Sequence, residues 1–111
     1  MTADKYCVRY STQAKKDLKA IFSYIAYSLE ARQTADRQAG RIRDAVRALD
    51  FLPERHPVVD WEPWHSRMIR RLSVNNYVVY YRVEPEQSIV KIMRIVYGGR
   101  DIKNITVAEE A

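Results

Sequence analysis

The fold is decided by residues 89–102, Ile-Val-Lys-Ile-Met-Arg-Ile-Val-Tyr-Gly-Gly-Arg-Asp-Ile. The first nine are apolar and rich in β-branched side chains, apart from Lys91 and Arg94. This pattern is typical of a central strand that is covered on most of both faces. The pair Gly98 and Gly99 then frees the backbone from strand geometry, so we expect the strand to end there.

Two side chains at the exit of this strand suit a contact site. Tyr97 precedes the glycine pair, and Arg100 and Asp101 follow it. A cation and a phenol at the end of a rigid strand are better placed to contact an anion than to fill a core. We therefore take Tyr97 and Arg100 as candidate contact residues.

Length and composition limit the possible classes. The 111 residues suffice for one domain, residues 1–111, with a modest core. The 19 Lys and Arg outnumber the 14 Asp and Glu, and the net charge of +5 favours an acidic partner, either nucleic acid or protein. No apolar run has membrane-spanning length and no signal peptide is recognisable, so we expect a cytoplasmic protein with no membrane partner. One cysteine and two histidines predict no disulfide, no metal site and no cofactor.

The N-terminal third predicts a strand followed by a helix. The strand is Tyr6–Tyr10, and Ser11 or Thr12 can cap a helix that runs to about Glu30. One apolar stripe at helical spacing supports this helix: Ala14, Leu18, Ile21, Phe22, Ile25 and Leu29. Three lysines lie largely off the stripe, and we interpret them as a solvated face rather than a nucleic-acid surface: Lys15, Lys16 and Lys19.

A second helix is predicted from about Thr34 until Pro53 stops it. Its apolar residues alternate spacings of four and three, a seam typical of two packed helices: Ala35, Ala39, Ile42, Val46 and Leu49. Small residues at its start allow close approach, and the short connection predicts an antiparallel helical hairpin.

The segment Pro53–Ser66 is predicted to be a loop because its prolines are incompatible with a sheet interior. Trp61 and Trp64 are expected to anchor this loop to the body of the protein rather than to stack on bases. His56 and His65 are interpreted as ordinary loop histidines, since no carboxylate lies at a spacing that indicates a catalytic pair.

The C-terminal half predicts three consecutive strands. Arg67–Val74 is joined to Tyr77–Val83 by an Asn-Asn turn, and the turn 84–87 leads to Ile89–Tyr97. Residues after about 103 are expected to form a short helix or a frayed tail. The order β-α-α-β-β-β predicts an α+β domain, with a four-stranded antiparallel sheet and the helical hairpin on one face.

This sheet would carry many arginines. If the helices cover one face, buried unpaired guanidinium groups are too costly there, so the arginines should favour the other face or the rim as a cationic concave surface. The candidates for target or nucleic-acid contact are Arg67, Arg70, Arg71, Arg82, Arg94 and Arg100. The alternative is ordinary surface ion pairing with Glu62, Glu84, Glu86 and Asp101.

Two motifs carry a family resemblance. Asn-Tyr-Val-Val-Tyr-Tyr-Arg-Val (76–83) and Arg-Ile-Val-Tyr-Gly-Gly-Arg-Asp-Ile (94–102), in this order of elements, resemble the RelE/ParE toxins of bacterial type II toxin–antitoxin modules. The resemblance extends from Tyr6 to about Lys103. It implies a growth-arresting toxin that is neutralised by a cognate antitoxin, whose extended and often acidic segment wraps around it in a hetero-oligomer.

The RelE branch of this family implies an enzyme. Its members are metal-independent endoribonucleases that cleave mRNA on the ribosome, a reaction that needs proton transfer and cations around the phosphate. By position, the resemblance implies catalytic roles for Arg71 (or its neighbour Arg70), Arg100 and Tyr97. Two departures argue against this activity, because RNA-cleaving members usually carry arginine at the position of Val78 and the YoeB-like subgroup has histidine at that of Val96.

The ParE branch, whose members inhibit DNA gyrase by a protein–protein interaction, is the closer match. Its pattern of an aromatic, aliphatics and Tyr-Arg-Val fits residues 77–83, and its later segment fits residues 94–101 with Tyr97 in place of the usual histidine. No residue need then be catalytic, and Arg82 and Arg94 would brace the sheet through ion pairs. The remaining positions are structural: Trp61, Trp64, Tyr77, Gly98, Gly99 and Asp101. We therefore predict a ParE-like gyrase inhibitor, with a ribosome-dependent endoribonuclease second and a non-toxic nucleic-acid-binding module third.

Overall fold

The computed structural model describes residues 5–98. Its main elements are β1 (Cys7–Tyr10), α1 (Thr12–Ser23), the π-helical turn η1 (Tyr24–Ser28), α2 (Arg32–Arg47), β2 (Ile69–Val74), β3 (Tyr77–Glu84) and β4 (Ile89–Tyr97). Short 3-10 turns follow α2 at Ala48–Asp50, open the long loop at Pro53–Arg55, and join β3 to β4 at Pro85–Gln87. No helix within residues 5–98 is both long and apolar enough to cross a membrane.

The four strands form one sheet in the order β1-β4-β3-β2. The meander β2–β3–β4 is antiparallel, as predicted, and Asn75 adopts a left-handed φ of 54° in the first turn. β1 instead pairs with β4 in parallel, with Cys7 opposite Ile89. The α+β class and the order of elements are confirmed, but the sheet is mixed rather than wholly antiparallel. The parallel pair arises because the helical hairpin lies between β1 and the meander, so no short turn fixes their relative direction.

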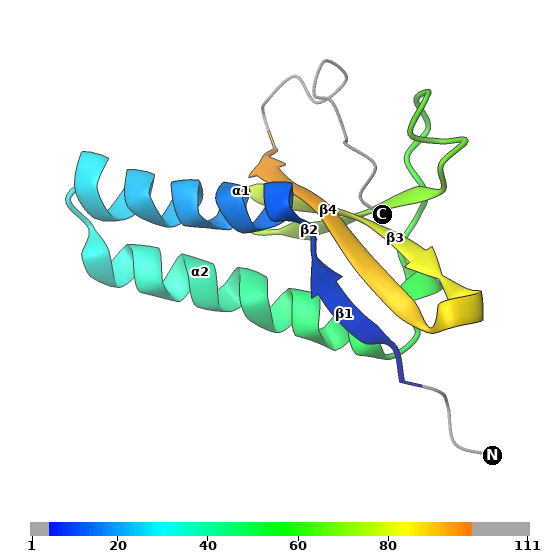
Figure 1. Cartoon of the computed structure of the whole chain (residues 1–111). Helices are drawn as coiled ribbons and strands as arrows, with labels where there is room; N and C mark the ends of the chain where they lie inside the picture. Colours follow the sequence, from blue (N-terminus) through cyan, green and yellow to red (C-terminus); the bar gives the residue numbers. More distant parts are fainter. Residues whose placement is uncertain (1–4, 99–111) are drawn as a thin grey trace.

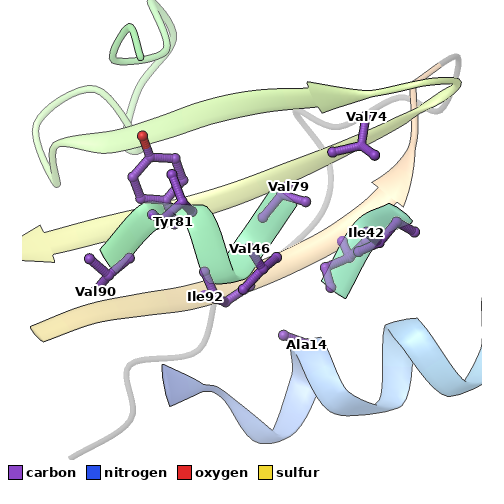
Figure 2. Packing of buried hydrophobic residues seen from close by; sticks show 10 residues of the cluster. Ala14, Ile42, Val46, Val74, Val79, Tyr81, Val90 and Ile92 are labelled. Carbon is purple, nitrogen blue, oxygen red and sulfur yellow. The ribbon is translucent and has the colours of Figure 1, made fainter. Parts of the chain in front are cut away.

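The helices cover one face of the sheet as a hairpin (Figure 1). α2 contributes Ile42 and Val46, which are almost fully buried against Val79, Tyr81 and Ile92 of the sheet (Figure 2). This is the seam predicted from the spacing of α2, and each large aliphatic side chain buried there contributes about 2 kcal/mol of transfer free energy.

A side-chain cap, a π turn and small buried residues shape the helical hairpin. The Ser11 hydroxyl accepts a hydrogen bond from Ala14 N at 3.0 Å and caps α1. α1 ends as an α-helix at Ser23 and continues as a π turn to Ser28, where the sequence predicted one helix to about Glu30. Ala35 is fully buried near Ala26, so small side chains do allow the helices to approach closely.

The second face of the sheet is also covered. The segment between α2 and β2 returns over it, with Val59 N donating to Ile69 O at 2.9 Å along the edge of β2. A second apolar cluster forms beneath this segment: Val59, Trp64, Ile69, Val78, Tyr80, Met93 and Val96. Aromatic and aliphatic side chains therefore occupy much of this face, and the arginines expected on this face or its rim do not form an open cationic surface across its centre.

β4 extends beyond the short strand β1. Side chains at the start of α1 form hydrogen bonds with the part of the β4 edge that β1 leaves unpaired. The Ser11 hydroxyl donates to Met93 O at 3.0 Å, while an Asp17 carboxylate oxygen accepts from Ile95 N at 2.9 Å. Side chains from the start of α1 therefore satisfy backbone groups that a strand partner would otherwise bond.

Candidate functional site

The predicted contact arginines have different fates. Arg94 forms two bonds to Asp17, with Nε to Oδ2 at 2.7 Å and Nη2 to Oδ1 at 3.0 Å, and both side chains are largely buried. Arg70 donates to the carbonyls of Glu54 and His56, at 3.1 and 2.6 Å. Both guanidinium groups thus hold elements of the fold together, Arg94 joining β4 to α1 and Arg70 joining β2 to the loop. Asp17, Glu54 and His56 are not among the acids that the sequence suggested as partners.

The other predicted positions are distributed as follows. Arg67 and Arg82 are half-buried, Arg67 at the end of the loop and Arg82 in β3 opposite Ile69. Arg71 is exposed on β2. Gly99, Arg100 and Asp101 lie outside the described residues.

The two tryptophans of the loop lie where anchors were expected. Trp64 is buried, and its ring centroid is 5.0 Å from that of Tyr80 in an edge-on contact. Trp61 is half-buried beside both of them. Neither tryptophan stands out as a free stacking platform, because both rings pack against β3.

A small polar pocket lies where β2 and β4 end and β3 begins, and we take it as the candidate site. Its volume is about 260 Å3. Arg71 and Tyr97, which come from different strands, both line it, and Gly98 closes one side with its N–H bonded to Asn76 O at 2.8 Å. The full lining is Arg71, Ser73, Asn75, Asn76, Tyr77, Val78, Tyr97 and Gly98.

Gly98 has a steric role in this pocket. A Cβ added there would lie 3.2 Å from Asn76 O and 3.6 Å from a Val78 methyl group. The first distance is tighter than most real contacts, so glycine allows the close approach of the β4 exit to the β2–β3 turn.

The side chains of the described part of the pocket suit contact with an anion better than proton transfer. One guanidinium, hydroxyl groups and side-chain amides are suitable donors to a carboxylate or phosphate. Its only other ionisable side chains, within the described residues, are Tyr77 and Tyr97. Burial, reinforced by the nearby Tyr97 and Tyr24 hydroxyls, raises the pKa of Tyr77 above its ordinary value of 10.0. A base for neutral pH needs the opposite shift.

The positions that depart from the nuclease pattern are inside the protein. Val78 and Val96 are 5% and 3% exposed, and both belong to the apolar cluster under the loop. An arginine or histidine at either position would require a different packing of this cluster. The two valines that differ from the nuclease pattern therefore both fit the apolar packing beneath the loop.

An apolar groove of about 750 Å3 adjoins the pocket on the helix side. Tyr77 and Tyr97 line both, with ring centroids 5.8 Å apart, and form the ridge between them. Tyr24 and Leu29 are more than half exposed on the far wall. Gln38 Nε2 on the same wall is buried without a hydrogen-bond partner among the described residues.

Sequence reasoning named Arg71 and Tyr97 but missed their neighbours. Ser73 and the turn residues Asn75 and Asn76 also line the pocket. A signal for Ser73 was present, because strand alternation places it on the same face of β2 as Arg71. The groove had no such signal, since its walls come from helix α1, the π turn, α2 and the sheet.

Comparisons with solved structures agree on the fold. The chromosomal ParDE toxin–antitoxin system from P. aeruginosa matches with a TM-score of 0.69 at 18% identity, covering 84% of this chain and 96% of the matched one. The RelBE2 toxin–antitoxin complex from Mycobacterium tuberculosis gives 0.62 at 21% identity, with coverages of 86% and 94%. The archaeal RelE–RelB complex from Pyrococcus horikoshii OT3 gives 0.58 at 20%, with coverages of 86% and 98%.

Sequence comparison is more specific. No curated protein sequence matches the chain significantly. The family model that describes the ParE toxin of the type II toxin–antitoxin system parDE matches residues 8–102, which is most of the chain. This chain therefore belongs to the ParE toxin family of type II toxin–antitoxin systems.

Proposed function

We propose that this chain arrests growth by inhibiting DNA gyrase through direct protein contact at the pocket between β2, β3 and β4. The observation that carries the proposal is the chemistry of the pocket. It offers Arg71 and Tyr97 as donors to an acidic or polar group, while burial raises the pKa of Tyr77 away from the neutral range. Binding without catalysis accounts for this combination, and we expect a carboxylate of the target to contact Arg71.

We also propose a cognate antitoxin as the partner that neutralises the toxin, in a hetero-oligomer formed in the cytoplasm. The matched structures support this, since one is described as a ParDE toxin–antitoxin system, another as a toxin–antitoxin complex and the third as a RelE–RelB complex. The excess of five positive charges on the chain is suited to an acidic antitoxin segment.

A ribosome-dependent endoribonuclease is the second candidate, because Arg71 and Tyr97 line one pocket although they are 26 positions apart (97 − 71). In this mechanism, the guanidinium would neutralise the phosphorane-like transition state and a further group would have to accept the 2′-OH proton. The described part of the pocket supplies the first function, but burial raises the pKa of Tyr77 away from the range that the second requires.

The test compares the two targets directly. Purified toxin is added to a gyrase supercoiling reaction and, separately, to programmed ribosomes whose mRNA ends are mapped. Inhibition of supercoiling without transcript cleavage is expected. Arg71→Ala should weaken inhibition by roughly tenfold or more, as loss of a charged contact usually does. Arg41→Ala, an exposed arginine on α2 outside the pocket, is the matched control and should have no effect.

The outcomes are distinct. Site-specific mRNA cleavage that disappears in Arg71→Ala would replace the gyrase proposal with the endoribonuclease. Loss of inhibition in both arginine variants would show a general charge effect and remove the pocket from the proposal. Neither activity, with no growth arrest on induction without antitoxin, would reject both mechanisms.

A further inference from the structure

Three cations lie side by side across the sheet, at the end of the strands opposite the candidate pocket. Arg9 of β1 pairs with Lys91 of β4, and Lys91 in turn pairs with Arg82 of β3. Residues directly opposite each other on neighbouring strands point to the same face of a sheet. The side chains of Arg9, Lys91 and Arg82 therefore form one row, which we call the cationic row.

The cationic row lies on the face of the sheet that the loop covers. Strand alternation places Arg82 on the same face as Tyr80, and Lys91 on the same face as Met93, and both Tyr80 and Met93 belong to the apolar cluster under the loop. The row is nevertheless open to solvent, because Arg9 is exposed and the Lys91 side chain keeps 25% of its accessible surface. Arg82 is half-buried. The loop therefore leaves this end of the face partly uncovered.

A hollow of about 310 Å3 adjoins the cationic row, and Arg9 and Lys91 both line it. Among the described residues, the acid of this lining is Glu84, whose Oε2 is 3.7 Å from Lys91 Nζ. One carboxylate beside three cations leaves two positive charges in excess. The row and its hollow thus form a compact region of positive charge.

The arrangement of the row has a cost for the sheet. Like charges directly opposite each other on neighbouring strands are destabilising, and two such contacts share Lys91. A bound anion would remove this repulsion. The row therefore suits the binding of an anionic ligand better than a purely structural role.

We propose that the cationic row binds the phosphate backbone of duplex DNA. Neighbouring strands are about 4.8 Å apart, so the three cations span about 10 Å. The phosphates of one DNA strand follow one another at about 3.4 Å along the helix axis, so this span meets about three of them. The contact involves no base edges and is therefore insensitive to base sequence.

Two features favour a duplex over other polyanions. Single-stranded nucleic acid binds where bases stack on free aromatic rings, but Trp61, Trp64 and Tyr80 of this face pack against one another. An acidic protein segment needs an apolar anchor beside its charges, and Ile89 is the one aliphatic side chain that lines the hollow among the described residues. A duplex backbone needs neither feature.

The cationic row is separate from the pocket proposed for the protein target. The pocket at Arg71 has no lining residue in common with the row or with the hollow beside it. Along β3, Arg82 lies five residues beyond Tyr77 of the pocket, which corresponds to about 17 Å. A protein target and a duplex would therefore contact different parts of the chain.

The first measurement is a fluorescence anisotropy titration of the full chain with a labelled DNA duplex about two helical turns long. Titrations at several salt concentrations give the slope of log affinity against log salt. The duplex should bind more weakly as the salt concentration rises, and single-stranded RNA of the same length and polyglutamate should both bind less tightly than the duplex. The titration contains neither gyrase nor ribosomes, so its failure would leave the proposed function intact.

Removal of the row should weaken binding and reduce its salt dependence. Arg9→Gln/Arg82→Gln/Lys91→Gln should lower the affinity by roughly tenfold or more and reduce the salt slope by about three, because each phosphate contact contributes about one. The matched control removes the same charge from exposed positions of α2 and should change both quantities much less: Arg32→Gln/Arg37→Gln/Arg41→Gln. Thermal melting checks that each variant is folded.

Glu84→Gln tests the row in the opposite direction. It removes the carboxylate beside Lys91 and keeps all three cations, so the affinity for the duplex should rise severalfold. Arg9→Gln changes only an exposed side chain and should lower the affinity without disturbing the core. A row with a purely structural role would give neither change.

Three results would overturn the proposal. Equal losses of affinity in the two triple variants would mean that only net charge matters. An unchanged or lower affinity of Glu84→Gln would show that the duplex does not contact the row beside Lys91. Tighter binding of RNA or of polyglutamate than of the duplex would replace DNA with that polyanion, and absence of binding by every probe would likewise reject the row as a binding surface.

Discussion

The two faces of the sheet are both apolar, but different kinds of structure cover them. On one face a regular helix packs its seam of Ile42 and Val46 onto Val79, Tyr81 and Ile92. On the other a loop without long regular elements places Trp64 over Val78 and Tyr80. The first contact repeats along two regular elements, whereas the second is made by a few loop side chains, Val59, Trp61 and Trp64. Equal burial therefore need not mean equal resistance to local opening.

Truncation of the helix seam should have the largest effect. Ile42 is fully buried, so Ile42→Ala should lower the free energy of unfolding by about 4 kcal/mol through lost burial and the cavity left behind. Denaturant unfolding followed by circular dichroism measures this loss. Ile42→Val, which removes a single methylene, is the control and should cost about 1 kcal/mol. A loss for the alanine variant as small as that of the valine variant would mean that the seam collapses to fill the cavity.

Truncation of the loop anchor should have a smaller and more local effect. Trp64→Ala should lower the free energy of unfolding by about 3 kcal/mol, and the loop should open locally before the rest of the molecule unfolds. Hydrogen exchange should show faster exchange for the Val59 and Ile69 amides, with the α2 amides still protected. Uniform loss of protection in both regions would show instead that the two faces form one cooperative unit.

Tyr81 joins the helices on one face to the loop on the other. Removal of its hydroxyl group should lower the free energy of unfolding by about 1 kcal/mol. Its ring is in the core under the helices, while its hydroxyl donates to Pro53 O of the loop at 2.6 Å. Tyr81→Phe keeps the ring and leaves that carbonyl without this donor. Chemical unfolding at neutral pH measures the loss, and an unchanged midpoint would mean that water replaces the bond.

Tyr81 should also contribute to alkaline sensitivity. Burial raises the pKa of its hydroxyl to about 12, against 10.0 in the unfolded chain. Between these values the unfolded state releases the proton and the folded state keeps it, so stability falls as the pH rises through this window. The decline should be shallower in Tyr81→Phe, and identical slopes for the two proteins would contradict the assignment.

The smallest effect is expected at acidic pH from His56. Its ring lies edge-on to Tyr81, and burial, followed by the charges of Arg55 and Arg70, lowers the pKa of the imidazole below 6.5. Below pH 6.5 the unfolded chain binds a proton that the folded chain resists, so stability should decrease as the pH falls through this region. His56→Gln should reduce this slope in thermal melts at graded pH, and a steeper slope would refute the prediction.

Features set by neighbouring residues could be predicted from the sequence. The seam of α2, the Ser11 cap and the turn at Asn75 each depend on short spacings, and the structure contains all three. The resemblance of residues 76–83 and 94–102 also identified the family, which the family model confirms.

Features that depend on distant contacts could not be predicted. The partner of Arg94 is Asp17, 77 positions earlier, and no local pattern links the two. The cover over the second face comes from a proline-containing segment whose sequence has no periodicity to reveal that Val59 and Trp64 share a cluster. The prediction that placed the arginines on this face or its rim did not include the apolar cluster that covers much of the face.

The contacts of Ser11 and Asp17 with β4 bear on self-association of the chain through the edge of this strand. β4 is the longest and most apolar of the strands in residues 5–98, and β1 pairs with only its first four residues, up to Ile92. An open edge beyond that point would be a template for adding a strand from another molecule. The serine and aspartate bonds to Met93 and Ile95 close this edge with side chains. These two bonds leave fewer backbone groups of β4 free to pair with a strand of a second copy.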